Sequence, residues 1–163
     1  MLSVEAKNII DEQIISKVQI GELALFLGAG ISIGTPSLNG QGIPSTPELI
    51  SRICKEAGYP SPDEEYTDLP TAFGVGQDDI PNFENFLISN FQSTQIHGWQ
   101  SDIFKLWWRI IFTTNIDNIA HVAIGQNSKT VNTYPDYKIY NYKDVEPVHS
   151  LPTSPPLVYL HGS

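Results

Sequence analysis

The chain has 163 residues, of which 40% are apolar and 17% charged, a balance typical of a folded globular protein of one domain's size. Its formal net charge of −9 argues against general nucleic-acid binding and against binding to acidic membranes, which both depend on Lys and Arg. The single cysteine, Cys54, excludes an internal disulfide and a zinc site of several thiolates. Met1 opens onto a polar segment and no apolar run is long enough for a membrane span, so we expect a cytoplasmic protein.

The first predicted element is an amphipathic helix over residues 3–20. Its apolar residues recur near the helical period with charged residues between them, and Gly21 ends the helix. We expect this helix to cover a sheet; contact with a partner is the alternative.

An apolar run over residues 23–27 leads directly into the turn Gly-Ala-Gly-Ile-Ser at 28–32. Such a run, bounded by glycine, predicts a buried strand of a parallel sheet. Glycine permits backbone angles closed to other residues and lets bare N–H groups approach a ligand. Turns of this kind after a first strand bind dinucleotide pyrophosphates. A purely structural turn is the alternative, because Ile33 stands where the pattern G-x-G-x-x-G requires its third glycine.

The next part of the chain predicts loops and helices in alternation. Residues 33–45 are rich in glycine and proline and predict a loop. Ser45 with Glu48 predicts a capping box at the start of a helix that ends near residue 57, before Gly58. Residues 59–81 predict a solvated acidic loop, with one short helix within it as an option, and without the ligand spacing of a metal site. Further helices are predicted over 82–91 and 100–108.

A second buried strand is predicted over residues 109–113, followed by a helix to about residue 123. Its end carries the polar residues Thr114, Asn115 and Asp117 at the place where α/β sheets bind ligands. Each of these residues is also a good helix cap, which is the alternative for any one of them. The three together with the glycine turn favour a binding site. Residues 124–156 lack clear periodicity and predict a long insertion, with a short strand over 130–132 as an option.

A third buried strand over residues 157–160 ends in His161-Gly162-Ser163. The three strand ends then lie on one edge of an α/β, Rossmann-like parallel sheet with flanking helices. Because the sequence stops after His-Gly, we expect a truncated sheet in which strand 157–160 has an unpaired edge. Residues 1–163 alone would then associate or depend on additional chain, and would show little activity.

Three short motifs in this order resemble the signature of the sirtuin-like family: Gly28-Ala29-Gly30-Ile31-Ser32, Thr114-Asn115-Ile116-Asp117 and His161-Gly162. That family has a Rossmann-type domain that binds NAD and breaks its nicotinamide–ribose bond. The resemblance spans residues 23–163, although between the motifs it is only architectural. It implies that residues 1–163 are the N-terminal part of a sirtuin-like catalytic domain.

Two departures distinguish the branches of the family. Protein-deacylating sirtuins carry Gly-Ile-Pro-Asp-Phe-Arg, whereas Gly-Ile-Pro at 42–44 is followed here by Ser-Thr-Pro-Glu-Leu. They also have Gln where Thr114 stands, and a shorter link from there to His-Gly. The chain therefore looks more like the sirtuin-like domains of bacterial defence proteins. Those domains hydrolyse NAD to nicotinamide and ADP-ribose and typically belong to larger, oligomeric assemblies.

Site roles follow from the chemistry and the resemblance together. Cleavage of the nicotinamide–ribose bond passes through an oxocarbenium-like state, and hydrolysis requires an anchored pyrophosphate, a held carboxamide and a positioned water. The residues expected to bind NAD are Gly28, Ala29, Gly30, Ser32, Thr114, Ile116 and Asp117. The resemblance implies that Ile116 and Asp117 hold the carboxamide, that Asn115 holds the attacking water or a ribose hydroxyl, and that His161 is the general base. The other histidines, His97, His121 and His149, have settings typical of loops or helices.

Two other functions stay open from the sequence. One is an NAD-dependent protein deacylase, against which the missing Asp-Phe-Arg counts. The other is a non-catalytic module that binds NAD or ADP-ribose and controls an attached effector. In each case NAD is the expected small-molecule partner, with a homo-oligomer or an additional C-terminal domain as the expected protein partner. No metal, nucleic acid or membrane is expected at residues 1–163.

Overall fold

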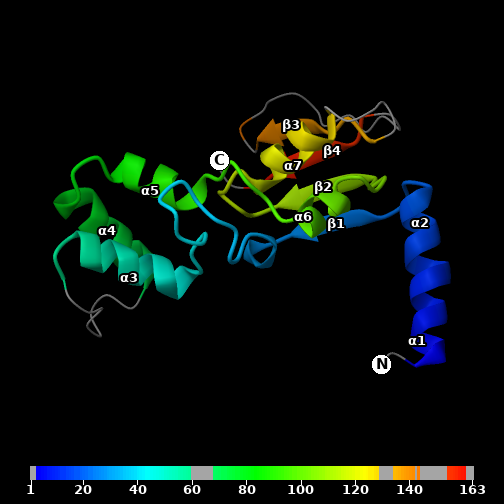
Figure 1. The fold of residues 1–163 in the computed structure, drawn as a ribbon, viewed down its shortest axis with the longest axis horizontal. Helices are drawn as coiled ribbons and strands as arrows, with labels where there is room; N and C mark the ends of the chain where they lie inside the picture. The colour runs from blue at the N-terminus through cyan, green and yellow to red at the C-terminus, as the bar shows by residue number, and fades with distance from the viewer. Residues whose placement is uncertain (1–2, 60–67, 129–133, 142, 144–153, 161–163) are drawn as a thin grey trace. The chain divides into compact units, whose positions relative to one another are not determined.

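The computed structural model describes residues 3–59, 68–128, 134–141, 143 and 154–160. The chain forms two compact units. Residues 1–31 and 96–163 make up the first, which we call the sheet unit, and residues 32–95 make up the second, which we call the helical unit. Figure 1 follows the chain through both. The helical unit is therefore inserted between the first and the second strand of the sheet.

The sheet unit is an α/β structure built on four parallel strands. They are β1 (Ala24–Leu27), β2 (Ile110–Thr113), β3 (Lys138–Asn141) and β4 (Pro156–Tyr159), in the order β1-β2-β4-β3. Leu27 lies opposite Thr113, and Thr113 lies opposite Tyr159. The three predicted strands are thus confirmed as neighbours whose carboxyl ends share one edge of the sheet. The predicted Rossmann-like α/β fold class is confirmed with them.

Strand β3 was not predicted, because it lies within the expected insertion 124–156. It pairs in parallel with β4, so that β4 has a neighbour on each side. The expectation that strand 157–160 has an unpaired edge is therefore wrong. The sequence of β3 lacks the apolar pattern that predicts a strand, because β3 is a short edge strand whose end residues, Lys138 and Asn141, are exposed and polar.

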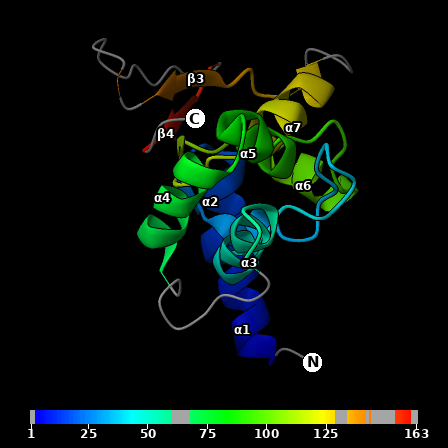
Figure 2. The same cartoon turned by 90° about the vertical axis from the view of Figure 1, so that its left-hand side faces the viewer.

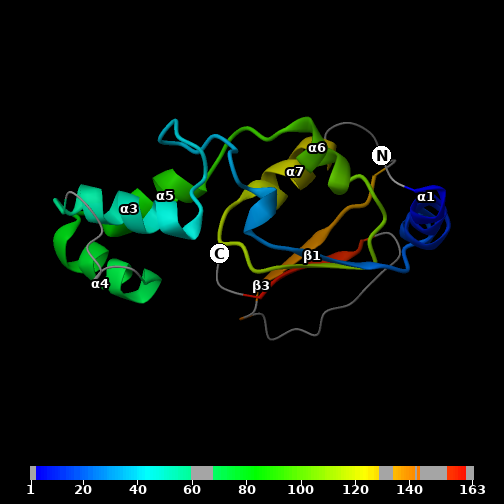
Figure 3. The ribbon, with the colours of Figure 1, turned by 90° about the horizontal axis from the view of Figure 1, so that it is seen from below.

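Helices α6 (Gly98–Ile103) and α7 (Ile119–Ser128) cover one face of the sheet, as Figure 3 shows. The core between these helices and the sheet contains Leu27, Ile31, Phe104, Ile111, Ala120, Ala123, Ile124, Tyr137, Leu157 and Tyr159. On the opposite face Phe26 is 70% exposed and stacks on Phe112, with the ring centroids 4.9 Å apart. Helix α6 begins before the predicted 100–108 and ends well before residue 108.

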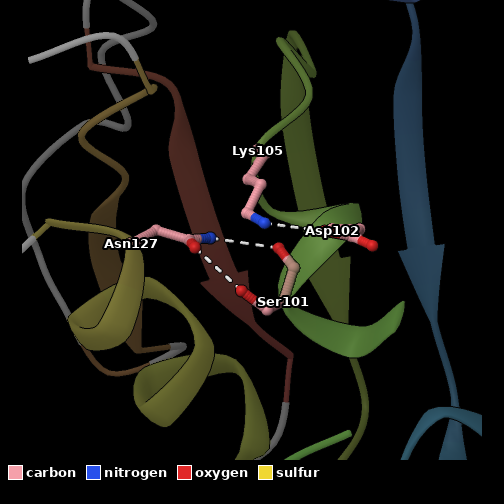
Figure 4. A network of polar contacts seen from close by, with 4 residues as sticks. All are labelled: Ser101, Asp102, Lys105 and Asn127. Atoms are coloured by element: carbon pink, nitrogen blue, oxygen red, sulfur yellow. Dashed lines mark hydrogen bonds and ion pairs between the residues drawn. The ribbon is translucent and has the colours of Figure 1, made fainter. Parts of the chain in front are cut away.

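A buried amide joins the two covering helices. The Asn127 side chain, on α7, accepts a hydrogen bond from the Ser101 hydroxyl (2.8 Å) and donates one to the Ser101 carbonyl (3.0 Å). Beside this pair, Lys105 and Asp102 form an ion pair at 2.7 Å (Figure 4). Because Asn127 is only 4% exposed, its two hydrogen bonds fix α7 against α6 in a specific register.

The N-terminal helix is continuous but not uniform. It consists of α1 (Val4–Ile9), the π-helical segment η1 (Ile10–Ile15) and α2 (Ser16–Gln19), and it ends before Gly21, whose φ is 69°. The expectation that this helix covers the sheet is wrong. Among its described residues only Val18 is buried, and Figure 1 shows it extending away from the strands. Contact with a partner stays a prediction for its exposed apolar side chains.

The helical unit contains α3 (Thr46–Glu56), α4 (Leu69–Asp79) and α5 (Phe83–Phe91), which can be followed in Figure 2. The predicted start of α3 is confirmed, since the Glu48 carboxylate accepts from the backbone N–H (2.7 Å) and the hydroxyl (2.8 Å) of Ser45. The predicted loop over 59–81 contains the 11-residue helix α4. The core of the helical unit contains Leu49, Ile50, Ile53, Cys54, Ala72 and Ile80. No helix in the described ranges is long and apolar enough to cross a membrane.

Truncation of Leu157 is expected to lower the free energy of unfolding by about 2–5 kcal/mol, because a cavity is left in a packed core. Leu157 is fully buried at the centre of the sheet, whereas Val4 is 78% exposed. Val4→Ala is therefore the control, with an expected change within about 0.5 kcal/mol. Urea unfolding followed by circular dichroism measures both. Equal losses in Leu157→Ala and Val4→Ala would contradict this description of the core.

Candidate functional site

The end of β1 forms a tight turn whose backbone faces solvent. After Leu27 the chain passes through Gly28 into η2 (Ala29–Ile31), a single 3-10 turn in which the Ile31 N–H donates to the Gly28 carbonyl at 3.1 Å. Residues 28–30 are exposed, while the Ile31 side chain is buried in the core. The predicted turn at the strand end is confirmed, and Ile31 anchors it.

The two glycines of this turn have ordinary backbone angles. The conformational freedom that glycine permits is not used here, since neither Gly28 nor Gly30 has a positive φ. A Cβ atom built on either residue would meet no other atom within 4 Å. The fold itself therefore does not require glycine at these two positions. Because glycine has no side chain, open space remains over these exposed residues, and a ligand could approach their backbone closely.

Hydrogen bonds tie the end of β2 to this turn. The Asn115 side-chain amide donates to the Gly28 carbonyl at 3.1 Å, and the Thr114 N–H donates to the Leu27 carbonyl at 3.3 Å. The Asn115 N–H also donates to the Thr113 hydroxyl at 3.1 Å. Asn115 is 9% exposed. The sequence predicted that the first two motifs meet, and the structure brings Gly28 and Asn115 into direct contact.

Asp117 has a structural role that the sequence offered as the alternative. Its carboxylate accepts a hydrogen bond from the Ile119 N–H at 3.0 Å, at the first residue of α7. Asp117 is 6% exposed, whereas the neighbouring Ile116 side chain is 44% exposed. Helix capping therefore accounts for the position of Asp117, and a ligand contact there would be an additional role.

A tyrosine–histidine pair at the end of β4 was not predicted. The Tyr159 hydroxyl lies 2.9 Å from Nδ1 of His121, a residue of α7. Burial raises the pKa of Tyr159, and the negative charge of Asp117 raises it further. Tyr159 is therefore a neutral hydroxyl in contact with an imidazole. The sequence signal was weak, because only the tertiary fold brings the end of β4 to the first turn of α7.

Two predicted site residues cannot be placed in this geometry. His161 lies outside the described residues; the preceding Leu160 donates its N–H to the Thr113 carbonyl at 2.9 Å, at the carboxyl edge of the sheet. Ser32 is the first residue of the helical unit and its side chain is buried. The expected roles of His161 and Ser32 stay predictions.

A small apolar hollow adjoins the glycine turn. Its volume is about 280 Å³, and Gly28 and Gly30 form part of its wall. The rest of the lining consists of Phe26, Leu27, Ile31, Trp99 and Ile103. Trp99 is 50% exposed and was not predicted as a site residue, because nothing in the sequence links α6 to the end of β1. The hollow offers apolar contacts directly beside the exposed residues of the turn.

The described ranges contain no group of three or more His, Cys, Asp or Glu side chains that could hold a metal ion. No protein-family model matches the chain, and neither a curated protein nor a solved structure matches it. The function is therefore argued from the site itself and from the three motifs.

Protonation of His121 is expected to destabilise the protein. His121 is exposed overall, but partial desolvation of its ring lowers its pKa, so the folded state favours the neutral imidazole. Stability is then complete above the ordinary pKa of about 6.5 and decreases as the pH falls below it. Urea midpoints at about pH 5 and about pH 8 measure this loss, which should shrink in His121→Gln, a variant that does not titrate. An equal loss in the variant would exclude His121 as its source.

Proposed function

We propose that the edge of the sheet formed by the turn at 28–30 and by Asn115 binds NAD, and that the complete site hydrolyses its nicotinamide–ribose bond. One observation carries the proposal. Gly28 and Gly30 have open space where side chains would be and no positive φ, and the Gly28 carbonyl accepts a hydrogen bond from Asn115 at the end of the neighbouring strand. Two glycines that the fold does not need are accounted for by a ligand that approaches the backbone closely.

The turn would hold the pyrophosphate. Backbone N–H groups in a glycine-containing turn at a strand end are suited to phosphate oxygens, because they supply hydrogen bonds and partial positive charge without side-chain bulk. Ser32, the residue that follows the turn, is a predicted further contact. The apolar hollow beside Gly28 and Gly30, with Trp99 in its wall, would receive an uncharged part of the dinucleotide.

Hydrolysis would proceed by attack of water on C1′ of the ribose as the bond from C1′ to the nicotinamide nitrogen breaks. The bonding electrons leave with nicotinamide, and the proton of the water passes to His161 as general base. Asn115 would hold the water or a ribose hydroxyl. Thr114, Ile116 and Asp117 would complete the nicotinamide side, with Asp117 at the same time capping α7. The products are nicotinamide and ADP-ribose.

The resemblance of the three motifs to the sirtuin-like family supports this reading, and the departures after Gly-Ile-Pro favour the defence-associated branch. We therefore place the activity in the cytoplasm of a bacterium, as NAD depletion in antiphage defence. The protein would act as a homo-oligomer or with an additional domain or partner.

The test is to incubate the protein, as residues 1–163 and at its full natural length, with NAD and to separate the products by chromatography. Equal release of nicotinamide and ADP-ribose without an acyl peptide supports the proposal. Nicotinamide release that requires an acylated peptide would make the protein a deacylase. Tight binding of intact NAD without turnover would make it a non-catalytic module, and no binding at either length would overturn the site.

A further inference from the structure

The helical unit contains a second pocket, unrelated to the NAD proposal. It lies along α3 and α5, with Asn39 and Gln41 of the preceding loop also in its lining, and has a volume of about 740 Å³. Small-molecule sites typically occupy roughly 300–1,000 Å³. Every residue that lines it belongs to 32–95, so the pocket is complete within one unit. We call it the α3–α5 pocket.

A fixed arginine forms part of its wall. The Arg52 guanidinium donates one hydrogen bond to the side-chain carbonyl of Asn90 (2.7 Å) and another to the carbonyl of Gly42 (2.8 Å). Both acceptors are neutral. In the described part of the chain no carboxylate lies within ion-pair distance of Arg52. The positive charge is therefore held in place by neutral acceptors, and Glu48, one turn earlier on α3, attracts it only from beyond ion-pair distance.

Asn90 holds this arrangement together. It is 1% exposed, and its side-chain carbonyl also accepts from the Asn39 amide at 2.9 Å. Its own amide donates to the Phe86 carbonyl at 2.9 Å. Since every one of these contacts is internal, the wall is ordered before any ligand arrives. A ligand would not have to bear the cost of ordering the arginine.

The remaining lining favours an anion that carries hydroxyl groups. Lys55 supplies a second positive charge next to Arg52 along α3, against one acidic residue, Glu56. The pocket wall is thus net positive, whereas the whole chain has a net charge of −9. The other polar residues of the lining are amides and serines, which hydrogen-bond hydroxyl groups, and Phe86 adds an aromatic surface.

We propose that the α3–α5 pocket binds a small phosphorylated molecule rich in hydroxyl groups, with its phosphate at Arg52 and Lys55. A guanidinium held by neutral acceptors retains its charge for phosphate, which it can contact through two parallel N–H groups. The amides and serines contact the sugar hydroxyls. A nucleotide and a sugar phosphate share this chemistry, and they differ in whether a base also stacks against Phe86.

Calorimetric titrations of the full chain with AMP, ribose 5-phosphate and inorganic phosphate test the proposal. Lys55→Glu is expected to weaken binding of the first two by about tenfold or more, as loss of a charged hydrogen bond does. Lys55 is exposed, so this variant should fold normally. Lys17→Glu makes the same charge change in the N-terminal helix and should leave binding unchanged. Arg52→Lys should also weaken binding, because lysine lacks the paired donors.

The outcomes separate cleanly. AMP binding that exceeds ribose 5-phosphate binding and that falls in Phe86→Leu identifies a nucleotide, and equal binding of the two identifies a sugar phosphate. Inorganic phosphate binding as tightly as either would overturn the hydroxyl-rich part of the proposal. No binding of any probe, or equal binding in Lys55→Glu and Lys17→Glu, would overturn it altogether. Because no residue of the NAD proposal lines the α3–α5 pocket, none of these results depends on NAD turnover.

Discussion

Replacing Asn115 with alanine is expected to reduce NAD hydrolysis by about 10²–10⁴-fold, the typical effect of losing a group that positions a proton transfer. The side chain comes from the end of β2 and contacts the glycine turn through the Gly28 carbonyl at 3.1 Å. In the proposed mechanism it holds the water or a ribose hydroxyl, so its loss affects the chemical step. NAD consumption under saturating substrate measures the effect, and His161→Ala should show a loss of similar size.

A structural effect of Asn115→Ala must be separated from a catalytic one. Asn127→Ala is the matched control, because Asn127 is also a buried asparagine of the sheet unit, 4% exposed, with two hydrogen bonds to Ser101. Each lost hydrogen bond costs about 0.5–1.5 kcal/mol of stability. We expect Asn127→Ala to unfold at lower denaturant yet to hydrolyse NAD at the parent rate. Folded Asn115→Ala and His161→Ala variants that both turn over NAD within a few-fold of the parent would refute their roles.

Three strands could be predicted from the sequence because an apolar run is visible without knowledge of its neighbours, but the prediction that residues 23–27 are buried is wrong, since β1 is an edge strand with Phe26 70% exposed. β1, β2 and β4 are such runs, and their polar ends indicated the functional edge. β3 could not be predicted in this way, since only its two central residues, Ile139 and Tyr140, are apolar, and its ends, Lys138 and Asn141, are polar and exposed at the edge of the sheet. The N-terminal helix shows the converse. Its periodicity predicted the helix correctly, but periodicity does not say whether the apolar side is covered.

Helix α4 was hidden by its glycines. Gly76 lowers the helix propensity of the segment, and the reason for it is tertiary. A Cβ atom at Gly76 would lie 2.3 Å from the Phe83 ring, so the close packing of this helix against Phe83 requires glycine. The separate core of the helical unit depends on such contacts between α3, α4 and the aromatic residues of α5. No local sequence pattern predicts these contacts, because each joins residues of different helices.

The candidate site divides in the same way. Positions at strand ends, Gly28 and Asn115, were predictable because parallel strands bring their carboxyl ends to one edge. The contact between His121 and Tyr159 and the place of Trp99 beside the turn were not, since each joins a helix to a strand end. For Asp117 the sequence left two alternatives open, helix capping and ligand binding, and the structure shows the capping contact.

Alanine at Gly28 or Gly30 is expected to leave the fold intact and to abolish most NAD binding. Neither glycine has a positive φ, and a Cβ atom would meet nothing within 4 Å. The unfolding free energy should therefore stay the same or rise by up to about 1 kcal/mol, because alanine restricts the unfolded chain. A ligand that rests on the bare backbone would instead collide with the new methyl group. We expect the Kd for NAD to rise by about tenfold or more, the result of losing roughly 1.4 kcal/mol of binding energy.

Gly125→Ala is the control for this prediction. Gly125 is an exposed glycine within α7, and a Cβ atom there also meets nothing within 4 Å. Alanine in a helix interior adds about 0.5–1 kcal/mol of stability, so this variant should be more stable than the parent and bind NAD equally well. The comparison isolates the ligand from the fold, since all three substitutions add one methyl group to open space. Equal NAD affinity in Gly28→Ala, Gly30→Ala and Gly125→Ala would show that no ligand approaches the turn, and the proposed anchor would be lost.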